Sequence, residues 1–245
     1  MLSIRVGRAL LAVLVCAGVV GCRNAPPETQ QGPVGAPPPP SKSSARSERA
    51  RPRIVVLGDS LSAGLGLLET ESYPALLQQK LDADGYDWEI VNAGISGDTS
   101  AAGLQRLDWA LDGDVRVLVL ELGANDGLRG LSIAEMKRNL AQIVERAQAR
   151  HIAVLLAGME APPNFGPEYA ASFRRTYREL AAEYHVTLIP FLLDRVAGLA
   201  SLNQRDGIHP NPEGARIVAD TVWTALKPMV DAASDTAGSR GVPHP

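Results

Sequence analysis

Short apolar runs alternate with amphipathic segments between about residues 53 and 231. Five runs are rich in strand-favouring apolar residues and are typical of buried parallel strands; they lie at 54–57, 88–92, 115–122, 152–156 and 186–190. The segments between them predict helices at about 74–83, 99–111, 133–149, 168–184 and 213–230. Strands that alternate with helices in this way predict an α/β fold, in which helices cover both faces of a parallel sheet.

The segment 133–149 shows the clearest helical pattern. Its apolar residues recur at helical spacing and fall on one face; they are Ile133, Met136, Leu140, Ile143, Val144 and Ala147. Ser132 and Glu135 stand at the spacing of a capping box, which marks the start of a helix.

Polar, glycine-rich segments follow the predicted strands rather than precede them. The carboxyl ends of parallel strands meet at one edge of the sheet, where open α/β sheets bind ligands. Four such segments are expected to converge there; they are 58–60, 92–98, 123–127 and 206–210. The sequence therefore predicts one site on this edge.

Ser60 is the candidate nucleophile, because Gly58-Asp59-Ser60 ends the first apolar run abruptly. A serine hydroxyl needs a general base, and the base needs an orienting partner. His151 and His185 lie at the amino ends of predicted strands and His244 lies in the tail, so only His209 is expected on the site edge. Asp206 is close enough to orient it, although Asp-x-x-His is also a common surface turn.

A developing oxyanion needs neutral hydrogen-bond donors fixed in place. The side-chain amide of Asn125, the backbone N–H of Gly97 and the backbone N–H of Ser60 are candidates. Glycine at position 97 lets a substrate approach the backbone closely.

These blocks, in this order, resemble the SGNH (GDSL-like) hydrolase family. The resemblance covers essentially all of residues 53–231, and the blocks are Gly58-Asp59-Ser60-Leu61-Ser62, Gly97, Gly123-x-Asn125-Asp126 and Asp206-x-x-His209-Pro210. Within the family, the segments around Gly97, Asn125 and His209 look most similar to the bacterial thioesterase I/lysophospholipase/arylesterase group. The resemblance implies a three-layer α/β/α sandwich whose five-stranded parallel sheet has a flavodoxin-like strand order.

The resemblance also implies the roles of the site residues. Ser60 would be the nucleophile, His209 the general acid/base and Asp206 its orienting partner, with Ser60, Gly97 and Asn125 as the oxyanion hole. The implied activity is hydrolysis of aryl and lysophospholipid esters and of acyl thioesters through an acyl-serine, with no metal or cofactor. A carbohydrate O-deacetylase acting on cell-wall glycans would use the same residues and stays open as an alternative.

Two other classes of α/β protein fit less well. Gly64-Leu65-Gly66 suggests a phosphate loop, but Glu69 stands where the third glycine would be and would repel phosphate. The nucleophile elbow of α/β-hydrolases needs a glycine at position 62, which is serine here. Finally, the proline-containing segment 159–167 follows the fourth strand, and we expect it either to wall an acyl pocket or to be an ordinary loop.

Residues 1–22 have the features of an export signal. Arg5 and Arg8 precede an apolar run, 9–20, that is too short to cross a bilayer comfortably. Its end, Val19-Val20-Gly21-Cys22, resembles the lipobox of bacterial lipoproteins, which implies lipidation of Cys22; a plain signal peptide cut near Gly21 is the alternative. We expect an exported lipoprotein on the periplasmic side of the envelope, and Arg23 after the cysteine suggests the outer membrane in a Gram-negative host.

Composition sets the remaining expectations. Residues 23–52 are rich in Pro and Ser and predict a disordered tether, with a Pro-rich partner motif as the less favoured interpretation; residues 232–245 predict a disordered tail. Both cysteines, Cys16 and Cys22, precede the folded domain, so it has no internal disulfide. The net charge of −3 gives no basic footprint for nucleic acid, and we expect a monomer acting on a small-molecule or lipid ester.

Overall fold

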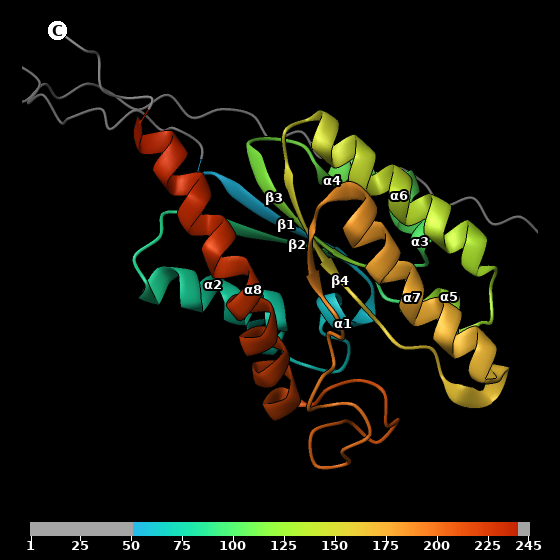
Figure 1. Cartoon of the computed structure of the whole chain (residues 1–245). Helices are drawn as coiled ribbons and strands as arrows, with labels where there is room; N and C mark the ends of the chain where they lie inside the picture. Colours follow the sequence, from blue (N-terminus) through green and yellow to red (C-terminus); the bar gives the residue numbers. More distant parts are fainter. Residues whose placement is uncertain (1–50, 240–245) are drawn as a thin grey trace, which may run out of the picture. The chain divides into compact units, whose positions relative to one another are not determined.

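The computed structural model describes residues 51–239. The predicted signal peptide, Cys22, nearly all of the predicted tether and residues 240–245 lie outside this range. Five parallel strands form one sheet in the order β2-β1-β3-β4-β5 (Figure 1); they are β1 (Arg53–Gly58), β2 (Glu89–Gly94), β3 (Val115–Glu121), β4 (Ala153–Ala157) and β5 (Thr187–Ile189). The flavodoxin-like order is therefore confirmed.

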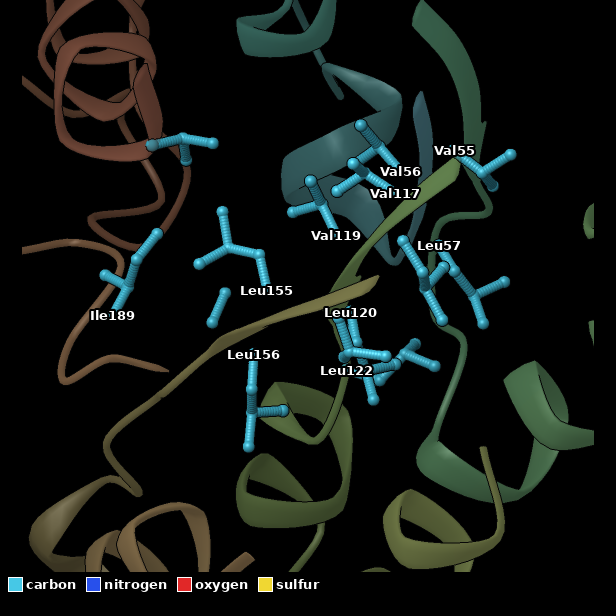
Figure 2. Close-up of a cluster of buried hydrophobic side chains, with 14 of the residues drawn as sticks. Val55, Val56, Leu57, Val117, Val119, Leu120, Leu122, Leu155, Leu156 and Ile189 are labelled. Carbon is cyan, nitrogen blue, oxygen red and sulfur yellow. The ribbon is translucent and has the colours of Figure 1, made fainter. Parts of the chain in front are cut away.

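The register of the central strands fills both faces of the sheet with apolar side chains. Val56, Val119 and Leu155 are neighbours across β1, β3 and β4, and so share one face. The next residue of each strand forms the matching row on the other face (Figure 2); this row is Leu57, Leu120 and Leu156. All six side chains are fully buried, which explains why these runs are apolar throughout rather than alternating.

Two groups of helices cover the sheet. Helices α2 (Tyr73–Ala83) and α8 (Pro212–Ser239) pack together on one face (Figure 1). The other face is covered by α3 (Ser100–Gln105), α6 (Ile133–Ala149) and α7 (Pro167–Tyr184). Five short elements complete the described chain; they are α1 (Ser60–Ala63), η1 (Glu69–Glu71), α4 (Leu107–Ala110), α5 (Ala124–Leu128) and η2 (Pro163–Phe165).

Helix α6 has the predicted bounds and buried face. Ser132 caps it by accepting a hydrogen bond from the Glu135 N–H at 3.4 Å. The Glu135 side chain faces Arg138 at 3.6 Å, so only half of the predicted capping box is formed.

Two helices differ from the sequence prediction. The predicted helix 99–111 is broken at Arg106, which leaves helical geometry between α3 and α4. Helix α8 continues to Ser239. The prediction of a disordered tail over residues 232–245 is therefore wrong for residues 232–239. The extra turns are held because Ala233 packs against the core and Ser234 accepts a hydrogen bond from the Trp88 indole at 3.2 Å.

The parallel topology places the carboxyl ends of all five strands at one edge of the sheet. Helix α1 follows β1 there, α5 follows β3, and the long segment 190–211 leads from β5 to α8 (Figure 1). These are the segments that carry the predicted site residues. Between residues 51 and 239, no helix is long and apolar enough to cross a membrane.

Candidate active site

Ser60 is the first residue of α1 and lies directly beyond the end of β1. The Asp59 carboxylate caps this helix by accepting the Leu61 N–H at 3.0 Å. Position 58 has no room for a side chain, because a Cβ would collide with the Ser62 hydroxyl and the Glu121 carboxyl group. Glycine is needed there for this reason and not for a special backbone angle. The turn that presents Ser60 is therefore packed directly against the buried end of β3.

The sequence-predicted serine, histidine and aspartate form one hydrogen-bonded chain. The Ser60 Oγ lies 2.8 Å from His209 Nε2, and His209 Nδ1 lies 2.7 Å from Asp206 Oδ2. In the tautomer with the proton on Nδ1, His209 donates to Asp206 and its Nε2 accepts the hydroxyl proton of Ser60. This is the geometry in which imidazole acts as a general base toward a serine.

The turn 206–209 fixes the imidazole from its backbone as well. Asp206 Oδ1 accepts the N–H groups of Ile208 at 3.0 Å and His209 at 3.1 Å. The hydrogen bond from the His209 ring, followed by these two backbone bonds, lowers the pKa of Asp206 to about 2. Asp206 is therefore ionised at neutral pH and stabilises positive charge on His209.

Gln204 ties this turn to the loop after α1. Its N–H donates to the His209 carbonyl at 2.7 Å, and its side-chain amide donates to the carbonyls of Pro210 at 3.0 Å and Leu65 at 2.7 Å. These hydrogen bonds of Gln204 join the segment after Ser60 to the segment that carries His209, in addition to the direct Ser60–His209 hydrogen bond.

The three predicted oxyanion donors lie at the same edge of the sheet, but only Ser60 and Asn125 line the cavity. Ser60 opens α1, so its N–H has no acceptor within the helix. The Asn125 side chain lines the same cavity as Ser60 and donates one of its two amide hydrogens to Asp59 at 3.1 Å, which leaves the other for a ligand. Gly97 has a φ of 88°, in the left-handed region, and its carbonyl accepts a hydrogen bond from Arg129 at 2.8 Å; it is not among the residues that line the cavity.

A buried polar network that the sequence interpretation missed lies beneath the turn. Glu121, the last residue of β3, accepts the Asp59 N–H at 3.2 Å and the Ser62 hydroxyl at 2.6 Å, and Ser62 is in turn 2.7 Å from the Tyr73 hydroxyl. Burial raises the pKa of Glu121 well above its usual range, and the nearby Asp59 carboxyl raises it further. Burial also raises the pKa of Asp59. The available signal was an acidic residue at the end of a run otherwise predicted to be buried.

A second missed network joins the loops that carry Gly97 and Asn125. Buried Asp126 accepts the Ser100 N–H at 2.8 Å and the Ser100 hydroxyl at 2.6 Å, and Asn139 of α6 donates to the same hydroxyl at 3.0 Å. Arg106 also forms an ion pair with Asp98 at 2.6 Å, which holds the loop after β2. The loops after β2 and β3 are therefore positioned by charged and polar groups rather than by apolar packing alone.

A cavity of about 240 Å³ opens beside Ser60 and His209. Its wall is mainly apolar, with contributions from the segments that follow β1, β3, β4 and β5; the apolar lining includes Leu61, Leu128, Met159, Pro162, Phe191 and Ile208. The segment 159–162 therefore walls the pocket, as one of the two sequence interpretations expected. Phe165 instead packs against Tyr169, with the rings tilted by 51° and their centroids 5.4 Å apart.

The other described histidines lie away from this edge. His151 and His185 directly precede β4 and β5, at the amino ends of those strands, as predicted. Residues 51–239 also hold no cluster of three His, Cys, Asp or Glu side chains placed to bind a metal ion.

Comparison with protein families matches residues 56–217 to the GDSL-like lipase/acylhydrolase family. Esterase TesA of Pseudomonas aeruginosa is 45% identical over 184 residues, which is 75% of this chain and 92% of the relative. The thioesterase 1/protease 1/lysophospholipase L1 of Escherichia coli K12 is 38% identical over 179 residues, which is 73% of this chain and 85% of the relative.

A solved structure gives the same result in three dimensions. The crystal structure of a TesA matches with a TM-score of 0.70 at 45% sequence identity, and the match covers 72% of this chain and 99% of that one. The matched portion is thus nearly the whole of the solved protein.

Proposed function

The chain belongs to the GDSL-like lipase/acylhydrolase family, and from this premise we propose that it is a serine esterase that uses Ser60, His209 and Asp206 as a catalytic triad. Its relatives are named esterase, thioesterase, lysophospholipase and arylesterase, and the chain is an ester-hydrolysing enzyme of the same class. The hydrogen-bonded chain Ser60–His209–Asp206 is the observation that carries the proposal.

Acyl transfer proceeds in two steps. His209 Nε2 takes the proton of the Ser60 hydroxyl as Oγ attacks the ester or thioester carbonyl, and ionised Asp206 stabilises the imidazolium that forms. The imidazolium then protonates the leaving alcohol or thiol, and the acyl group remains on Ser60. Water, deprotonated by the same His209, attacks the acyl-serine and releases the acid.

The Ser60 N–H, the Gly97 N–H and the free hydrogen of the Asn125 amide form the oxyanion hole in this proposal. All three donors are neutral N–H groups, and they stabilise the developing negative charge on the carbonyl oxygen by hydrogen bonding. The bond from Asn125 to Asp59 supports its role, because it fixes the orientation of the amide before substrate binds.

The cavity supports substrates with an apolar acyl or aryl group. A volume of about 240 Å³ is several times the ~30 Å³ share of one water molecule, and its wall offers apolar contact to a chain of several carbons. We therefore propose aryl esters, lysophospholipids and acyl thioesters as substrates, hydrolysed by a monomer. The O-deacetylase alternative needs room only for an acetyl group, and the cavity does not favour it.

The experiment that tests this function uses p-nitrophenyl esters with acyl chains of two to sixteen carbons. Ser60→Ala should retain the folded structure and lower kcat by about 10⁴–10⁶, whereas Ser201→Ala, at an exposed serine, should hydrolyse the esters at the wild-type rate. Rates near wild type in Ser60→Ala would refute the triad. Ser60-dependent activity confined to the acetate would favour the deacetylase instead.

We also propose that the enzyme is a lipoprotein, anchored through Cys22 on the periplasmic side of the envelope and, in a Gram-negative host, sorted to the outer membrane. The sequence supports this with the apolar run 9–20 that ends at Gly21-Cys22. Residues 23–52 would then separate the catalytic domain from the anchor.

A further inference from the structure

The exposed apolar side chains of the enzyme are gathered at the edge that carries the active site. Five loops follow the carboxyl ends of the strands, and we call them the rim; they are residues 64–72, 95–99, 122–132, 158–166 and 190–211. Of the nine large hydrophobic side chains that are exposed in the described chain, eight lie on the rim. The ninth, Trp109, lies on α4, which leads into the amino end of β3.

Several loops of the rim line the cavity or contact one another beside it. Leu128 and Ile208 line the cavity from opposite loops, and Leu65 is joined to the His209 turn through Gln204. Phe165 packs against Gly130, so the loops after β3 and β4 are also in contact. Single exposed hydrophobic residues are normal on a protein surface, but a gathering of this size marks an interaction site.

We infer that the rim is a docking surface for a lipid aggregate, a membrane or micelle from which the ester substrate enters the cavity directly. This inference rests on the proposed function and adds the physical form of the substrate. A protein partner that covered the rim would also close the mouth of the cavity. A lipid surface on the same rim supplies the substrate instead.

Charge on the rim favours a neutral or zwitterionic surface. The five loops contain seven acidic residues and three arginines, and Glu69 and Glu71 closely follow Leu68, which is 68% exposed. The excess of acidic residues gives the rim no electrostatic attraction to anionic lipid, so apolar contacts must provide the free energy of binding.

The length of chain before the domain permits the rim to reach the bilayer that holds Cys22. The 30 residues 23–52 span at most about 100 Å when fully extended. Strand β1 begins at the edge opposite Ser60, and its six residues cross only ~20 Å. An anchored domain can therefore turn its rim toward the same membrane.

The test measures binding of the domain, residues 49–245, to phosphatidylcholine vesicles by cosedimentation. The described residues belong to one compact unit, and a solved relative consists almost entirely of the matched portion, so this segment folds on its own. The rim variant is Leu68→Gln/Leu199→Gln, at two exposed residues that do not line the cavity. Its matched control is Trp109→Gln, at the exposed apolar residue away from the rim.

The rim variant should bind vesicles at least about tenfold more weakly than wild type, because each leucine loses burial of its apolar surface. Trp109→Gln should bind as wild type does, and anionic lipid or salt should change neither result. Both variants should hydrolyse soluble p-nitrophenyl acetate at the wild-type rate. In the full chain, the rim variant should lose activity only on esters embedded in vesicles.

Equal binding by the two variants, or no binding by wild type, would overturn the inference. Self-association in the absence of lipid that is lost in the rim variant would also overturn it, because a second copy would then be the occupant. Ser60→Ala separates this inference from the proposed function: it should bind vesicles normally while hydrolysing nothing. A wild-type domain that binds vesicles but hydrolyses no ester would refute the function alone.

Discussion

Glu121 places a fully buried carboxyl group directly beneath the turn that carries Ser60. One carboxyl oxygen accepts both the Asp59 N–H and the Ser62 hydroxyl, while the other has no hydrogen-bond partner among the described residues. It interacts electrostatically with Asp59, Tyr73 and Tyr177, none of which is a cation. Burial and the Asp59 carboxyl together favour the protonated form.

The raised pKa of Glu121 predicts a pH-dependent stability. Below the pKa that Glu121 has in the unfolded chain, its carboxyl group is protonated in both states, and its ionisation does not change the free energy of unfolding. As the pH rises above that value, folding must take up a proton, so the free energy of unfolding falls by up to about 1.4 kcal/mol per pH unit until the folded pKa is reached. Glu121→Gln, which keeps an acceptor oxygen and cannot ionise, should lack this contribution.

Urea denaturation of both proteins between pH 5 and pH 8 measures the effect. The free energy of unfolding of wild type should fall relative to that of Glu121→Gln as the pH rises, whatever their difference at pH 5. Contributions from other groups, such as Asp206 at low pH, are common to both proteins and largely cancel. Parallel stability curves across this range would show that Glu121 is ionised in the folded enzyme.

At this scale the sequence predicted which candidate side chains would come together at one edge, but it missed the residues that hold them in place. Ser60, Asn125 and His209 each follow a strand in a polar turn, and the rule that parallel strands gather their carboxyl ends was sufficient to bring them together. Glu121 and Arg106 were missed because their partners come from other strands, and no local pattern records a contact across the sheet.

Arg106 marks the point where the predicted helix 99–111 divides into α3 and α4. Its guanidinium pairs with Asp98 at 2.6 Å and donates to the carbonyls of Ala93 at 2.6 Å and Gly58 at 2.9 Å. These carbonyls lie at the ends of β2 and β1, beside the turn that carries Ser60. The helix is therefore interrupted at the residue whose side chain binds the ends of both strands.

Arg106→Ala should therefore lower the free energy of unfolding by about 3 kcal/mol, because it leaves Asp98 and two backbone carbonyls without their cationic donor. Arg116→Ala is the matched control: Arg116 also pairs with an aspartate, Asp114, but its side chain is 51% exposed. The control should cost less than about 1 kcal/mol. Similar losses in both variants, measured by urea denaturation, would contradict a supporting role for Arg106.

The elements themselves were largely predictable, because their strongest signals are local. Every strand was placed within about two residues, and α6 has its predicted bounds. The end of α8 could not be predicted, because residues 232–239 are small or polar and are typical of a disordered tail. Their helix is stabilised by Trp88 and Tyr86, from the segment before β2, and Tyr86 donates a hydrogen bond to Asp231.

The whole molecule adds a membrane anchor to this domain in our proposal, and the two cysteines allow a controlled test. Cells that express the chain with labelled palmitate should incorporate label into wild type and Cys16→Ser but not into Cys22→Ser, because only Cys22 follows a small residue at the end of the apolar run. Label retained in Cys22→Ser, or absent from wild type, would show that the leader is an ordinary signal peptide.

The separation of Ser60 from His209 by 149 residues has a consequence for the timing of activity. Synthesis and export both deliver a chain from its amino end, so the proposed nucleophile emerges long before its proposed base. Asp206 and His209 lie within the last 40 residues, and until these arrive the serine has no group to take its proton. If the enzyme is exported as we propose, this chain order delays completion of the site until nearly the whole domain has crossed the membrane.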